Sequence, residues 1–137
     1  MICDQLRKAD IARIKVEMRA LELGVVCSRP VIEGTRYDCI LDTGDRLYRA
    51  QIKYADGKAS KTLGVVIVNL RKQIGKDRNH PYLEHEVDVI LVYVAKIDAI
   101  CWFDPEVFNG KSSLSIRIAP SLNGQSKGCL LASDYLW

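Results

Sequence analysis

Two apolar-rich runs flank a polar turn in residues 37–53, which read Tyr-Asp-Cys-Ile-Leu-Asp-Thr-Gly-Asp-Arg-Leu-Tyr-Arg-Ala-Gln-Ile-Lys. The Thr-Gly-Asp turn predicts a β-hairpin, because glycine adopts the positive φ that a tight turn requires. Alternation along the second run places Gln51 and Lys53 on the same face of their strand. Asp38 opens the partner strand. We therefore expect a carboxylate, an amide and an ammonium group to converge on one face of a sheet.

These three side chains are typical of a metal-dependent phosphodiester hydrolase. Mg²⁺ prefers oxygen ligands and commonly takes one or two carboxylates together with water and phosphate. Such an ion polarises a phosphate and lowers the pKa of an attacking water, while a nearby lysine stabilises the developing negative charge. The candidate metal ligands are Asp38, Gln51 and the backbone carbonyl of Ile52, and Lys53 is the candidate catalytic lysine. The alternative is an ordinary solvated sheet face, because a Gln-x-Lys pattern alone is weak evidence.

Length and composition favour one globular domain over residues 1–137, with 48% apolar and 27% charged residues. The net charge of +3 gives no general basic signal, so a nucleic acid would bind through a local patch. No apolar run approaches the ~20 residues that cross a bilayer, and the charged N-terminal segment does not resemble a signal peptide. Five cysteines without a close pair favour reduced thiols. We expect an intracellular protein of the cytoplasm or nucleoid, without a membrane partner.

A helix is predicted from Asp4 or Asp10 to about Leu23, where Gly24 is a typical helix stop. Apolar residues at helical spacing predict a core-facing stripe on it. This stripe comprises Ile11, Ile14, Met18 and Leu21, with Val25 as a further candidate member. On the same helix Arg13 and Glu17 are spaced i and i+4, so a surface ion pair is one interpretation of Glu17.

Further strands are predicted at residues 63–70, 87–94, 97–103 and 114–118, with flexible turns at 123–124 and 127–128. The apolar run at 87–94 predicts a strand covered on both faces. Residues 71–81 read as a basic loop, and they provide the candidate DNA-binding residues Arg71, Lys72, Lys76 and Arg78. A solvated loop is the alternative. One helix, a mixed sheet and irregular C-terminal elements together indicate an α/β or α+β fold.

The order of these features resembles the PD-(D/E)XK nuclease superfamily. The matching features are the first helix, Pro30, Tyr37-Asp38, the hairpin and Gln51-Ile52-Lys53. More narrowly, the chain is similar to the branch of group I intron-encoded homing endonucleases that has Gln at the second acid position. The similarity continues over almost the whole chain, through Glu86–Val89, Val92-Tyr93, Ser113–Arg117, Asn123–Gln125 and Ala132–Tyr135.

This resemblance implies a restriction-endonuclease-like α/β core, with a mixed central sheet flanked by the N-terminal helix. It implies Asp38 as the metal-binding acid, Gln51 at the second ligand position and Lys53 as the catalytic lysine. The chain departs from the family pattern on the first helix, where Ile11-Ala12 is followed by Arg13 instead of glutamate. Glu17, one turn later, is the nearest acid that could replace it.

The sequence thus predicts an endonuclease that hydrolyses double-stranded DNA with Mg²⁺, with Mn²⁺ able to substitute, and resembles a site-specific homing endonuclease. A small module has limited surface for a long DNA site, which favours a homo-oligomer, either a dimer or a tetramer. Three alternatives remain open. They are a structure-selective nuclease such as a junction resolvase, a DNA-binding protein with impaired catalysis on the same fold, and an unrelated α+β binding domain.

Overall fold

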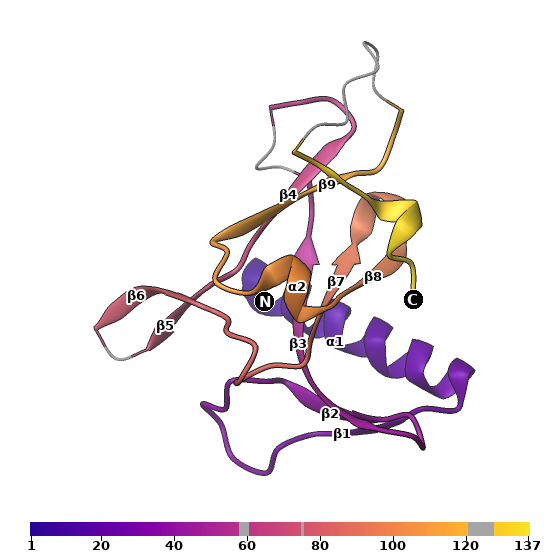
Figure 1. Ribbon diagram of the computed structural model, residues 1–137, viewed down its shortest axis with the longest axis vertical. Coiled ribbons are helices and arrows are strands. Elements are labelled where there is room, and N and C mark those ends of the chain that lie inside the picture. The colour runs from indigo at the N-terminus through magenta and orange to yellow at the C-terminus, as the bar shows by residue number, and fades with distance from the viewer. Residues whose placement is uncertain (58–60, 75, 121–127) are drawn as a thin grey trace.

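The computed structural model describes residues 1–57, 61–74, 76–120 and 128–137 (Figure 1). Its helical elements are α1 (Asp4–Leu23), η1 (Ala95–Ile97), α2 (Pro105–Phe108) and η2 (Ala132–Asp134). Its strands are β1 (Val26–Ser28), β2 (Cys39–Asp42), β3 (Leu47–Ala55), β4 (Val65–Asn69), β5 (Arg71–Ile74), β6 (Asp77–Pro81), β7 (Val89–Val94), β8 (Ala99–Phe103), β9 (Ser113–Arg117) and β10 (Leu130–Leu131). This mixed α/β arrangement confirms the predicted fold class.

The predicted hairpin is formed by β2 and β3, which pair antiparallel from Asp42↔Leu47 to Cys39↔Ala50. Gly44 has a φ of 89°, a conformation that glycine adopts without strain. The side chain of Asp42 accepts the Gly44 N–H at 2.9 Å. Local turn chemistry therefore fixes the hairpin register, and with it the side chains that share a face.

The hairpin belongs to a five-stranded sheet with the order β1-β2-β3-β7-β8. β3 and β7 are parallel, whereas the other neighbours are antiparallel. All six residues of β7 are buried, which confirms the prediction of a strand covered on both faces. β7 is accordingly an interior strand, and its partner β3, the middle strand of the five, carries the predicted site residues.

Two hydrophobic cores cover the two faces of this sheet. On one face, residues of α1 pack against Ala50 and Val89. On the other, Ala55 and Ile90 pack with a second sheet of order β10-β9-β4 and with aromatic residues such as Tyr82 and Phe103. Alternate residues of β3 therefore face opposite cores. Gln51 and Lys53 lie on the face away from α1.

The predicted core stripe of α1 is wrong for three of its members, whereas Ile11 and Val25 are partly buried against the core. Ile14, Met18 and Leu21 are 52%, 55% and 76% exposed, and Ile11 is half-buried. The helix instead buries Ala12, Val16 and Ala20. These small side chains also repeat at helical spacing, and they allow the helix to approach the sheet closely. The helix ends as predicted, with Gly24 in the left-handed conformation at φ 72°.

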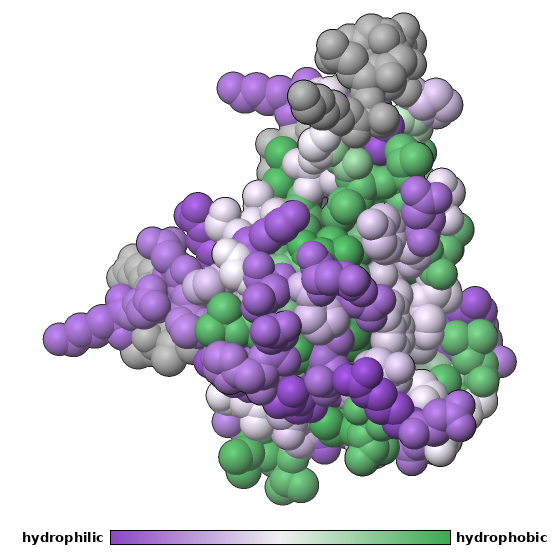
Figure 2. Space-filling view, viewed as in Figure 1, coloured by the Kyte–Doolittle hydropathy of each residue, from purple (hydrophilic) through white to green (hydrophobic). Residues whose placement is uncertain are grey.

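The prediction of a basic loop at residues 71–81 is also wrong, because the segment forms a hairpin of β5 and β6. Arg71 pairs with Pro81 and Lys72 with His80, and the register shifts between Lys72 and Ile74. The hairpin projects from the body (Figure 1) and hydrophilic side chains gather on it (Figure 2). The turn predicted at 123–124 lies outside the described residues, as does Lys127. In the described part of the chain, no helix has the length and apolarity needed to cross a membrane.

Candidate functional site

The candidate site forms where β2 stops pairing with β3. The last bond between the two is the Asp38 N–H donating to the Ala50 carbonyl at 2.8 Å. Because the N–H and C=O of one strand residue point to the same side, those of Ile52 also face this open edge. The Ile52 N–H donates to Oδ2 of Asp38 at 2.8 Å. The Asp38 carboxylate thus accepts a backbone N–H of β3 that β2 no longer reaches. The backbone of β3 therefore fixes the position of the carboxylate.

Gln51 completes a short network with this carboxylate. Its Nε2 donates to Oδ2 of Asp38 at 2.8 Å. The residue is only 7% exposed, and its Oε1 is buried without a hydrogen-bonding partner. An unpaired buried amide oxygen costs free energy on the order of 1–3 kcal/mol. An oxygen in this state is ready to accept a bond from a ligand that is bound during function.

Lys53 lies on the same face and is largely covered by protein. Its Nζ is 5.0 Å from the centre of the Tyr82 ring, and Tyr82 is 1% exposed. Burial lowers the pKa of Lys53, the Asp38 carboxylate opposes this shift, and Lys72 adds to it. Among the described residues the ammonium has no ion pair or hydrogen bond, so its donors are available to a ligand.

Asp38 lies at the surface, yet the protein around its carboxyl group perturbs its ionisation. Desolvation raises the pKa of Asp38, and the Ile52 N–H, Lys53 and Lys72 partly offset this effect. A raised carboxyl pKa indicates an anion with too little favourable interaction in the ligand-free protein. A cation bound beside Asp38 would supply that interaction.

The donor set fits a hard divalent cation. Oδ2 of Asp38 is occupied by two N–H donors, which leaves Oδ1 without a hydrogen bond in the described structure. Oε1 of Gln51 is unpaired, and the Ile52 carbonyl lies on the same strand edge. Oxygen atoms of these three kinds are typical Mg²⁺ ligands. No cluster of three or more His, Cys, Asp or Glu side chains suited to a metal occurs among the described residues, so an ion here would have a single carboxylate ligand.

Glu17 is not brought into this cluster. It forms ion pairs with Arg13 at 3.2 Å and Arg29 at 2.8 Å, so the predicted pair with Arg13 is present. Its helix packs on the opposite face of the sheet from Gln51 and Lys53. A catalytic role for Glu17 stays a prediction without a supporting contact.

Of the candidate DNA-binding residues on the β5–β6 hairpin, Lys72 lies near the site. Nζ of Lys72 donates to the Thr35 carbonyl at 2.5 Å, close to Asp38 in the chain. Arg71 and Lys76 are exposed, and the side chain of Arg78 is outside the described residues. No local sequence signal links Lys72 to Asp38, because the approach depends on how the hairpin docks.

Ion pairs fix the segments that flank the site. The guanidinium of Arg36 contacts both carboxylate oxygens of Glu86, with Nη1 at 2.6 Å from Oε1. Asp88 similarly accepts from Nε of Arg49 at 2.9 Å and from the Arg49 backbone N–H at 2.8 Å. Sequence patterns did not reveal these pairs. They join the chain before β2, the start of β3 and the chain before β7 into one framework.

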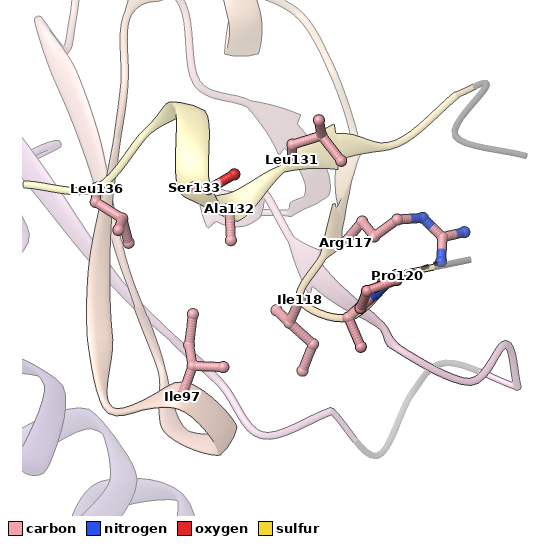
Figure 3. Close-up of a pocket in the computed structure, with 9 residues that line it drawn as sticks. Ile97, Arg117, Ile118, Pro120, Leu131, Ala132, Ser133 and Leu136 are labelled. Carbon is pink, nitrogen blue, oxygen red and sulfur yellow. Dashed lines mark hydrogen bonds between the residues drawn. The ribbon is translucent and has the colours of Figure 1, made fainter. Parts of the chain in front are cut away.

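A groove of about 670 Å³ continues from the site along the open edge of β3. It includes Ile52 and Lys53, and its polar side chains are Gln5, Lys8, Asp56, Asn69 and Ser113. A smaller hollow of about 350 Å³ lies elsewhere, against β9 and β10. Figure 3 shows apolar side chains there, including Ile97, Ile118 and Leu131, together with Arg117. That hollow has no carboxylate and is not part of the candidate site.

The chain is similar to known proteins in sequence and in fold. A family model described as PD-(D/E)XK endonuclease matches residues 3–137. Among solved structures, a bacterial homing endonuclease, I-Ssp6803I, superposes with a TM-score of 0.76 at 26% sequence identity, covering 98% of this chain and 89% of that one. A comparison with curated protein sequences found no significant match. A family match over nearly the whole chain, a shared fold and an Asp-Gln-Lys cluster all agree, and the chain belongs to the PD-(D/E)XK endonuclease family.

Proposed function

We propose that this nuclease-family protein is a divalent-metal-dependent endonuclease that cuts double-stranded DNA at specific sites, as a homing-endonuclease-like enzyme. The observation that carries the proposal is the buried, unpaired Oε1 of Gln51 beside Asp38 and Lys53. The likeness to I-Ssp6803I, which is a homing endonuclease, supports the site-specific form. We take residues 1–137 as one nuclease domain.

In this proposal Asp38, Gln51 and the Ile52 carbonyl hold Mg²⁺, and Mn²⁺ can replace it. When bound, the ion would polarise the phosphodiester and lower the pKa of the attacking water. Asp38 supplies the single negative charge, and the N–H groups of Ile52 and Gln51 hold its orientation. The Lys53 ammonium, which has no hydrogen bond or ion pair among the described residues, donates to a phosphate oxygen where negative charge accumulates.

DNA is proposed to pass between the basic hairpin and the groove along β3. Arg71, Lys72, Lys76 and Arg78 of this hairpin would contact DNA phosphates. The groove continues directly from Lys53 and Ile52. The nucleotides next to the cleaved phosphodiester would therefore lie in this groove. Contacts of this kind fix the register of a protein on DNA and make binding depend on salt.

We also propose self-association through α1, as a dimer or a tetramer. Ile14, Met18 and Leu21 are each more than half exposed, and contiguous exposed apolar surface marks an interaction site. Beside them, a hollow of about 540 Å³ is lined by Leu21, Val26 and Cys27, among others. Two copies would supply two active sites, one for each DNA strand. A monomer in sedimentation experiments at assay concentration would contradict this.

One alternative has a specific observation in its favour, namely a DNA-binding protein with impaired catalysis. Arg13 stands where the family pattern has a glutamate, and Glu17 is engaged by Arg13 and Arg29. If Glu17 nevertheless contributes to the reaction, Glu17→Gln lowers cleavage. Unchanged cleavage in that variant would assign Glu17 to the ion pairs alone.

The direct test is cleavage of linear duplex DNA and of a four-way junction, each with Mg²⁺ and with EDTA. We expect cleavage of the linear duplex that stops when the metal is removed, because the proposed reaction uses the ion to polarise the phosphodiester and to lower the pKa of the attacking water. Preference for the junction would identify a resolvase. Metal-dependent cleavage of neither substrate, with binding retained, would identify the impaired protein.

Gln51→Glu tests the ligand role of the amide oxygen. A carboxylate at this position adds a charged oxygen ligand of nearly the same shape, so we expect tighter Mg²⁺ binding without DNA in a calorimetric titration. We expect only a modest change in cleavage if Lys53 keeps its position. The matched control is Gln51→Ala, which should weaken Mg²⁺ binding and cleavage together. A lower melting temperature in Gln51→Glu without tighter Mg²⁺ binding would instead assign Gln51 a structural role, because the Nε2 bond to Asp38 is lost.

A further inference from the structure

We propose that Lys72 is a second lysine of the catalytic centre, and that it contacts the phosphate being cleaved. This inference rests on the proposed nuclease function and gives Lys72 a different role from the other basic residues of its hairpin. Those residues would contribute affinity for any DNA. Lys72 would contribute to the rate of the chemical step, so that docking of the β5–β6 hairpin completes the active site.

The placement of Lys72 comes from two successive contacts. Its Nζ donates to the Thr35 carbonyl at 2.5 Å. Oγ1 of Thr35 in turn donates to the Tyr37 carbonyl at 2.8 Å, and Asp38 is the next residue. The ammonium group is therefore tied to the short segment that leads into the metal-binding carboxylate.

The charges around Lys72 leave its ammonium group uncompensated. An ammonium has three N–H donors, and in the described structure only one of them has a partner, a neutral carbonyl. Arg36 lies nearby but is itself paired with Glu86. Burial lowers the pKa of Lys72, and Asp38 opposes that shift, so the two groups interact without forming an ion pair. Burial also lowers the pKa of Lys53, and Asp38 opposes that shift as well.

Two such lysines beside one carboxylate favour an anionic ligand. Without a metal, Asp38, Lys53 and Lys72 carry a formal charge of −1 + 1 + 1 = +1, counted from their residue types. A phosphodiester brings one negative charge and two non-bridging oxygens, which suit two separate N–H donors. The exposed Lys76 at the far end of the hairpin has no such relation to Asp38.

The experiment compares Lys72→Met with Lys96→Met, the same change at an exposed lysine of η1 that belongs neither to the site nor to the basic hairpin. Single-turnover cleavage with enzyme in excess measures the rate, and DNA binding in Ca²⁺ measures the dissociation constant. We expect Lys72→Met to lower the rate on the order of tenfold to a hundredfold. We expect Lys96→Met to keep both the wild-type rate and the wild-type slope of log affinity against log salt. Lys72→Arg, which keeps the charge, should recover part of the rate.

A second measurement is independent of activity. Reductive methylation of lysines in the metal-free protein, read by mass spectrometry, should be slowed at Lys72 by inorganic phosphate while methylation of Lys96 is unaffected. Equal rates in the two Met variants and wild type, or equal labelling of Lys72 with and without phosphate, would overturn the inference. If the wild-type protein cuts no DNA, the proposed function fails, and phosphate protection still decides whether Lys72 belongs to an anion site. Melting curves of both variants confirm that they are folded.

Discussion

Asp38→Asn is expected to lower Mg²⁺-dependent cleavage by about a hundredfold or more while DNA binding persists. Asparagine keeps the shape of the side chain, and its amide oxygen can still accept the Ile52 N–H that now donates to Oδ2. The variant removes the negative charge, and with its amide oxygen at the Oδ2 position it also puts an NH2 group where Oδ1 was available to the ion. A hundredfold loss in rate corresponds to about 2.7 kcal/mol of transition-state stabilisation.

Asp42→Asn is the matched control. Asp42 lies on the same hairpin, is exposed, and accepts the Gly44 N–H in the turn. We expect wild-type cleavage from it. Calorimetric titration of Mg²⁺ should show binding lost in Asp38→Asn and retained in Asp42→Asn. Cleavage by Asp38→Asn within a fewfold of wild type would remove Asp38 from the metal site.

The hairpin and the shared face of Gln51 and Lys53 were predictable because both depend on local rules. A glycine at position 44 permits the positive φ of the turn, and the two-residue period of a strand then assigns side chains to faces. The apolar run of β7 was predictable for a similar reason, because only a strand buried on both faces tolerates it. These elements hold most of the candidate site.

The buried face of α1 could not be predicted from periodicity alone. Two sets of apolar residues repeat at helical spacing, one with large side chains such as Ile14 and Met18 and one with Ala12, Val16 and Ala20. The close approach of the helix to small residues on the sheet, including Cys39 and Ala50, selects the second set. That distance is a tertiary property with no local signature.

The β5–β6 hairpin was missed because its strands carry charged and polar residues where the usual signal is alternation of apolar ones. Its pairing shows in the backbone register, Arg71↔Pro81 and Lys72↔His80, and not in the composition. The approach of Lys72 to Asp38 follows from this docking. Whether Oε1 of Gln51 has a hydrogen-bonding partner likewise depends on which donors surround it in the fold. The sequence therefore indicates Gln51 as a candidate ligand but does not show that its oxygen is unpaired.

Lys53→Met is expected to reduce cleavage on the order of a hundredfold or more and, at the same time, to stabilise the metal-free protein. Methionine retains an apolar side chain of similar length and removes the ammonium, whose Nζ lies 5.0 Å from the centre of the Tyr82 ring. Because burial lowers the pKa of Lys53 in the folded state, folding disfavours its charged form. The variant relieves that cost, and the melting temperature should rise.

The pH dependence distinguishes this explanation from simple repacking. A lysine whose folded pKa lies below its unfolded value destabilises the fold by a constant amount at pH values below the folded pKa. The cost diminishes as the pH rises from the folded pKa towards 10.5, the ordinary value for lysine. The gap in melting temperature between Lys53→Met and wild type should therefore be widest near neutral pH and narrow in alkaline buffer. Lys96→Met, on an exposed residue of η1, is the control and should show no such trend. Near-normal cleavage by Lys53→Met would contradict the assignment of the catalytic lysine. A melting temperature that does not rise would contradict the burial cost instead, so the two claims can fail separately.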